Sequence, residues 1–140
     1  MIHVDHMNNP KGYRKWIRKA AQETDCRVVI KQSYKNQDYS SRPKIVVGAI
    51  GNDRETVSLL LKRWRTSRVD VDSKSKPCYE RQMKVVVEGL LETANNIISN
   101  DLIDWDEAIS DENVTIPEER LMKLMESIGG LEWKEAFARI

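Results

Sequence analysis

The order of two hydrophobic periods along the first half of the chain limits its fold more than any other feature. Alternating or continuous runs of apolar, β-branched residues predict strands at 2–7, 27–31, 44–50 and 67–73. Helical spacing of apolar residues fills the gap after the first strand and the gap after the third. The resulting order, β-α-β-β-α-β, predicts a ferredoxin-like α+β fold in which both helices cover one face of an antiparallel sheet.

Both predicted helices begin at sequence signals that satisfy free backbone N–H groups. Asn9 is the expected N-cap of the first helix, and Pro10 follows where its missing N–H costs nothing. Asn52, with Glu55 three residues later, forms a capping-box pattern before the second helix. The apolar stripes expected to be buried are Tyr13, Trp16, Ile17 and Ala20 in the first helix and Val57, Leu60, Leu61 and Trp64 in the second.

After the fourth strand the sequence predicts further elements. Apolar residues alternate over 82–89 and predict an extra strand, with a helix at 79–91 as the competing interpretation. Eight carboxylates and no Lys or Arg lie within 101–119, which predicts a solvated acidic loop. A second capping box, at Thr115 and Glu118, then predicts C-terminal helices.

Length and composition favour one domain, 1–140, with a single hydrophobic core and no bound cofactor. No run of 18 apolar residues occurs, so no membrane association is expected. Cys26 and Cys78 lie far apart without a paired-cysteine motif, which predicts neither a disulfide framework nor a zinc site. These features are typical of a cytoplasmic or nuclear protein.

Charge is divided unevenly along the chain. The net charge is +1, but residues 1–69 hold 15 Lys or Arg and 6 Asp or Glu, whereas residues 70–140 hold 8 and 16. This division is typical of a basic binding face with an acidic loop, or of two halves that neutralise each other in the fold. The candidate nucleic-acid or partner-binding residues are the basic residues Arg14, Lys15, Arg18, Arg42, Lys44, Lys62, Arg63, Arg65 and Arg68.

Residues that could carry chemistry are few. His3 and His6 are expected on opposite faces of their strand, so no metal site is predicted. Asp70 and Asp72 share one face of a predicted strand, a geometry that a two-carboxylate site could use. No nucleophile elbow or phosphate-binding loop accompanies them. We therefore predict no enzyme and keep catalysis by Asp70, Asp72 and His3 as an alternative.

Five strings occur in order from His3 to about Phe137: HVDHM, KIVVGAIGN, TSRVDVDS, CYERQMKVV and LMKLMESIGGLEWKEAF. In this order and spacing they resemble the domain that follows the RWD module in RWD-domain-containing proteins, and more distantly the C-terminal domain of the pre-mRNA-processing factor three family. The most specific part is TSRVDVDS with Cys78 and Glu80 after it. The resemblance implies a ferredoxin-like fold with C-terminal additions, and it supplies no catalytic residues.

Two functions are consistent with these observations. The first is a binding module that engages RNA or a ribonucleoprotein through its basic surface, which the charge division and the splicing-factor resemblance favour. The alternative is a protein-interaction adaptor linked to ubiquitin-like (SUMO) conjugation, which the resemblance to RWD-domain-containing proteins implies. The expected protein partners therefore belong to the SUMO or splicing machinery.

Overall fold

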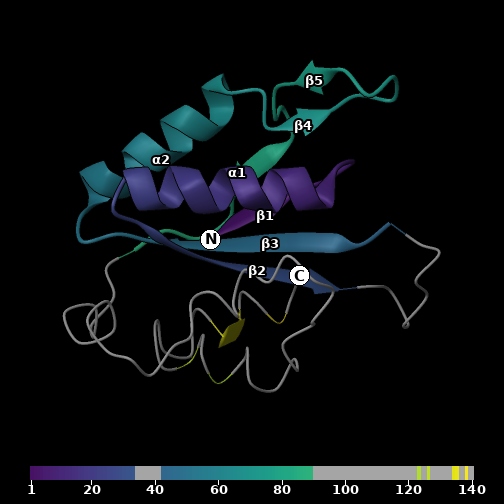
Figure 1. Ribbon diagram of the computed structural model, residues 1–140. Coiled ribbons are helices and arrows are strands. Elements are labelled where there is room, and N and C mark those ends of the chain that lie inside the picture. Colours follow the sequence, from purple (N-terminus) through teal and green to yellow (C-terminus); the bar gives the residue numbers. More distant parts are fainter. Residues whose placement is uncertain (34–41, 90–122, 124–125, 127–133, 136–137, 139–140) are drawn as a thin grey trace.

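A four-stranded antiparallel sheet carries two helices on one face (Figure 1). The computed structural model describes residues 1–33, 42–89, 123, 126, 134, 135 and 138. The elements are β1 (Ile2–Val4), α1 (Pro10–Glu23), β2 (Arg27–Ser33), β3 (Lys44–Ile50), α2 (Arg54–Thr66), β4 (Asp70–Val71), β5 (Pro77–Cys78) and β6 (Met83–Val85). Neither helix combines the length and the hydrophobicity needed to span a membrane, within this part of the chain.

The strand order β2-β3-β1-β6 confirms the ferredoxin-like α+β class. The path from β1 through α1 to β2 leaves β3 between the two strands. The path from β3 through α2 to β6 leaves β1 between that pair. At the centre of the sheet, Ile2 of β1 lies opposite Val47 of β3 on one side and Val85 of β6 on the other.

The fourth strand of the sheet is β6, and the prediction that 67–73 would fill this place is wrong. That segment contributes only β4, which pairs with β5 in a separate two-stranded hairpin. The chain reverses there because the Asp72 carboxylate accepts the backbone N–H groups of Lys74 and Lys76, at 2.8 and 2.9 Å. The competing helix at 79–91 is also wrong, since none of its described residues is helical.

The first strand is shorter than predicted and ends at Val4. Beyond it the Asp5 carboxylate contacts the His6 ring, and the backbone N–H groups of Asn8 and Asn9 bind Asp70 in β4. These side-chain contacts draw residues 5–9 away from the sheet and toward the start of α1. Local alternation of apolar and polar residues carries no information about such distant partners.

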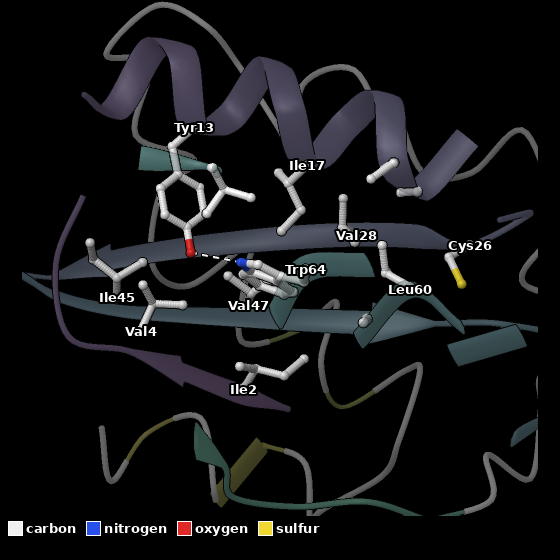
Figure 2. Packing of buried hydrophobic residues seen from close by; sticks show 14 residues of the cluster. Ile2, Val4, Tyr13, Ile17, Cys26, Val28, Ile45, Val47, Leu60 and Trp64 are labelled. Carbon is white, nitrogen blue, oxygen red and sulfur yellow. Dashed lines mark hydrogen bonds between the residues drawn. The ribbon is translucent and has the colours of Figure 1, made fainter. Parts of the chain in front are cut away.

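The core lies between the helices and the sheet (Figure 2). Tyr13 and Ile17 of α1 and Leu60 and Trp64 of α2 are each 0 % exposed, which confirms the centre of both predicted stripes. The stripe residues Trp16, Val57 and Leu61 are partly buried against the same cluster. From the sheet side, the cluster receives Ile2, Val4, Val28, Ile45, Val47 and Ala49. The burial stabilises the fold mainly through the hydrophobic effect.

Strand β3 is buried on both faces, as its continuous apolar run predicted. Ile45 and Val47 face the helices, whereas Val46 points the other way and is 1 % exposed. Val29 of β2 lies on that second face too and is 0 % exposed. The face of the sheet opposite the helices is therefore not open to solvent around these residues.

The two helix caps give one confirmed prediction and one correction. Asn9 caps α1 by accepting the N–H of Gly12 at 3.1 Å. The cap of α2 is Asp53, not Asn52: the Asp53 carboxylate accepts both the N–H and the hydroxyl of Thr56 at 2.7 Å. The capping-box assignment was wrong by one residue because Asn and Asp are about equally good caps, and here they are adjacent.

Replacing each of the two adjacent cap candidates by alanine gives a direct test of this assignment. We expect Asp53→Ala to lower the melting temperature at pH 7, whereas Asn52→Ala should leave it nearly unchanged. The Thr56 hydroxyl and then its N–H hold the pKa of Asp53 below its usual value. A lowered pKa contributes stability above the unfolded-state value of about 4, and that contribution is lost as the pH falls through the folded-state pKa.

The effect of Asp53→Ala should therefore shrink in acid. Thermal unfolding followed by circular dichroism at neutral and acidic pH measures both variants. Equal losses for Asn52→Ala and Asp53→Ala would show that the cap is wrongly assigned.

Only five residues after Gly89 are described. Lys123, Glu126, Lys134, Glu135 and Ala138 are all helical. The predicted acidic loop at 101–119 and most of the predicted C-terminal helices lie outside the described residues, so both remain predictions.

Candidate interaction surface

A chain of buried hydrogen bonds joins both helices to the segment after β5. The Tyr13 hydroxyl donates to Glu80 Oε2 at 2.8 Å. The same hydroxyl accepts from Trp64 Nε1 at 2.7 Å (Figure 2). The second Glu80 oxygen accepts the N–H of Gln82 at 2.8 Å. The rings of Tyr13 and Trp64 meet edge to face with centroids 6.2 Å apart. Both oxygens of a nearly buried carboxylate are thus bonded.

Burial, and then the charge of Glu80, raises the pKa of Tyr13. The phenol therefore keeps its proton at neutral pH, where it donates to Glu80. A fixed connection, which we call a joint, is therefore formed by Tyr13, Trp64 and Glu80. Breaking one of its hydrogen bonds would leave a buried polar atom without a partner.

A second joint fixes the hairpin to the start of α1. Asp70 is 5 % exposed, and its two oxygens accept the N–H groups of Asn8 and Asn9, each at 2.9 Å. The Asn8 side chain donates in return to the carbonyl of Val71 at 2.7 Å. The negative charge of Asp70 also lies at a helix N-terminus, where the helix dipole favours it. The hairpin is thus held in β4 through Asp70 and just after β5 through Glu80.

These two joints change the charge that the hairpin presents to solvent. We define the basic hairpin as residues 68–81, which hold four basic and three acidic residues. Asp70 and Glu80 are buried, which leaves Asp72 as the exposed carboxylate of the segment, and its Oδ1 already accepts two turn N–H groups. All four basic residues are exposed: Arg68, Lys74, Lys76 and Arg81.

An aromatic side chain lies within this basic group. Tyr79 is 43 % exposed, and the guanidinium carbon of Arg68 lies 5.5 Å from the centre of its ring. This distance is typical of a cation–π contact. In Figure 1 the hairpin of β4 and β5 lies beside the start of α1 and is not part of the four-stranded sheet. It is therefore the part of the described chain in which cations and an exposed aromatic ring occur together on a fixed support.

The nine basic residues predicted to bind a partner do not all come from one part of the fold. On α1, Arg14 donates to Gln32 of β2 at 2.6 Å, Arg18 follows one turn later and is half-buried, and Lys15 is exposed. At the start of β3, Arg42 is 3.3 Å from the Asp5 carboxylate and Lys44 is exposed.

The remaining predicted residues lie on α2 and just after it. Arg63 bonds to Glu23 at the end of α1 at 2.5 Å, whereas Lys62 and Arg65 are exposed. Arg68 alone among the nine belongs to the basic hairpin. The sequence analysis missed Lys74, Lys76, Tyr79 and Arg81, because the three carboxylates of the segment conceal its basic character until two of them are seen to be buried.

The residues of the catalytic alternative do not converge. The buried Asp70 carboxylate accepts two backbone N–H groups, whereas Asp72 is exposed in the hairpin turn. His3 follows Ile2 in the strand and therefore points to the face opposite the helices. The Asp5 carboxylate lies 2.9 Å from the ring of His6, and the hydrogen bond from the His6 ring lowers the pKa of Asp5.

The described residues form neither a metal site nor a reactive cysteine. Within them, no group of three or more His, Cys, Asp or Glu is placed to hold a metal ion. Cys26 and Cys78 are free thiols, the first buried in the core and the second half-buried in β5. Burial raises the pKa of both thiols, and nearby carboxylates raise that of Cys78 further. Both are therefore protonated and weakly nucleophilic at neutral pH.

Part of this chain is similar to a known human protein. The chain is 30 % identical over 93 residues to RWD domain-containing protein 3 of Homo sapiens, an alignment that covers 66 % of this chain and 32 % of the relative. The chain thus spans about a third of the length of the curated relative that it matches. No family model and no solved structure matches. These findings support a relationship to an RWD-domain protein, and they support neither the splicing-factor resemblance nor RNA binding.

Proposed function

We propose that this chain is a non-catalytic protein-interaction module. The observation that carries the proposal is the basic hairpin, in which two buried carboxylates fix a short projecting segment and leave its cations and Tyr79 exposed. Groups held rigidly before binding lose little conformational entropy when a partner docks. The relationship to an RWD-domain protein supports the same interpretation.

RNA binding through the basic surface is the rival function and stays a prediction. In the common sheet-based mode, bases stack on aromatic residues across the face of the sheet opposite the helices. Here that face holds Val29 and Val46, which are aliphatic and buried. Three of the basic residues assigned to RNA already contact side chains of the domain itself: Arg14, Arg42 and Arg63. A protein partner therefore fits the geometry better.

A role as an adaptor in SUMO conjugation is the finer form of this proposal. It rests on the resemblance to RWD-domain-containing proteins, and no contact within the described residues is specific to it. A partner from the conjugation machinery, recovered with this chain and bound directly after purification, would support this finer assignment over a splicing partner.

Affinity purification of the tagged chain from cell extract, with and without ribonuclease, tests the proposal. We expect the same proteins to be recovered in both samples, and at least one of them to bind the purified chain in isothermal titration calorimetry. Loss of all recovered proteins after ribonuclease treatment would instead show that RNA mediates the association, and would overturn the proposed function.

A further inference from the structure

We propose that the basic hairpin, residues 68–81, is the docking site for an acidic segment of a partner protein. This inference rests on the proposed function and adds to it the surface and the chemistry of the partner. The segment would contact Arg68, Lys74 and Lys76 through Asp or Glu side chains, and would place an apolar or aromatic side chain against Tyr79.

The turn of the hairpin is organised before any partner binds. Asp72 Oδ1 accepts the N–H groups of Lys74 and Lys76, and Ser75 between them has a φ of 60°. A further backbone bond runs from the N–H of Asp72 to the carbonyl of Lys76 at 2.9 Å. These contacts fix the backbone from which both lysine side chains extend into solvent. Association with a preformed surface requires less ordering than association with a flexible loop.

The charge of the exposed atoms identifies the partner as acidic. Burial of Asp70 and Glu80 removes two of the three negative charges of the hairpin from the surface, and Asp72 is occupied by the turn. Four cations are therefore exposed for contact, and the segment keeps a net charge of +1. Complementary charge steers a partner to the correct surface and excludes partners of the same sign.

The pair of Arg68 and Tyr79 favours a protein segment over RNA. A guanidinium group stacked on an aromatic ring can still donate through its planar N–H groups to a carboxylate in a two-bond arrangement. Because Arg68 lies over the Tyr79 ring, that ring has less surface left for the stacking of successive bases. One apolar or aromatic side chain beside carboxylates fits the remaining surface.

Charge reversal at the turn provides the test. The probe is a short fluorescein-labelled peptide of Glu and Asp residues around a central Phe, titrated with the full chain in fluorescence anisotropy. Lys74→Glu/Lys76→Glu should weaken binding by about tenfold, as expected for the loss and reversal of two exposed charge pairs. The matched control, Lys19→Glu/Lys84→Glu on exposed positions of α1 and β6, changes the net charge equally and should stay within about twofold of wild type.

A third variant tests the aromatic contact. Tyr79→Ser should weaken binding of the Phe-containing peptide about fivefold and have no effect on a peptide with Ser in place of Phe. Circular dichroism and thermal midpoints verify that each variant is folded. All the substituted side chains are exposed, so folding should be preserved.

Three results would overturn the inference: no binding of the peptide to the wild-type chain, equal weakening by both charge-reversed variants, or tighter binding of a single-stranded RNA of equal charge. The failure of this inference is distinguishable from that of the proposed function. A protein that binds the chain directly, and binds Lys74→Glu/Lys76→Glu equally well, would keep the interaction function and reject this docking site.

Discussion

Tyr13→Phe should lower the free energy of unfolding by about 3 to 4 kcal/mol, although it removes one oxygen atom and leaves the packing of the ring in place. This oxygen links two buried groups, the indole N–H of Trp64 and the carboxylate of Glu80. Without it, a buried N–H lacks an acceptor and a nearly buried charge loses a donor. Each of these losses costs more than an exposed hydrogen bond contributes.

Tyr79→Phe is the matched control, because it removes the same atom from an exposed ring. Its effect should stay below about 0.5 kcal/mol. Urea unfolding at pH 7 measures both variants, and the slope against denaturant should not change. If Tyr13→Phe were as mild as Tyr79→Phe, the buried hydrogen bonds of Tyr13 would not stabilise the fold.

A double variant tests the link between Tyr13 and Glu80. Combining Tyr13→Phe with Glu80→Gln should lower the free energy of unfolding by less than the sum of the two separate changes, because the residues share one hydrogen bond.

Asp70→Ala should lower the free energy of unfolding by about 2 to 3 kcal/mol. It removes the acceptor for two N–H groups at the start of α1 and the negative charge that favours this end of the helix. Asp72→Ala also removes an acceptor for two N–H groups, but in an exposed turn where water replaces it, so a loss of only about 1 kcal/mol is expected.

Urea unfolding compares the two aspartate variants, and amide hydrogen exchange locates their effects. In Asp70→Ala the amides of Asn8 and Asn9 should lose protection while those of β3 keep theirs. Equal losses of stability in Asp70→Ala and Asp72→Ala would contradict the different roles assigned to the two carboxylates.

The sequence predicts those elements whose signals are local. The helix α1 is marked by Asn9, Pro10 and a regular apolar stripe, and β3 by a continuous β-branched run, so both appear where expected. The alternation at 67–73 is equally regular, yet the chain reverses after Val71. Alternation shows that a segment can be extended, but the strand with which it pairs depends on the turn that Asp72 closes and on the long-range contacts of Asp70.

The candidate site is harder to predict because it depends on pairs that are distant in sequence. Tyr13 and Glu80 are 67 positions apart, and Asn8 and Asp70 are 62 apart. A count of charges gives equal weight to buried and exposed carboxylates, so the hairpin appeared almost neutral. The same count assigned Arg14 and Arg63 to a partner, whereas both contact groups of the domain itself.

The central claim, a protein-interaction module that acts through the basic hairpin, is tested most directly by affinity purification from ribonuclease-treated extract with three forms of the chain. Wild type and Lys19→Glu/Lys84→Glu should recover the same proteins, and Lys74→Glu/Lys76→Glu should lose those that bind the purified wild-type chain directly. Equal recovery by all three forms would contradict a role for the hairpin, and recovery that disappears with ribonuclease would contradict a protein-interaction function.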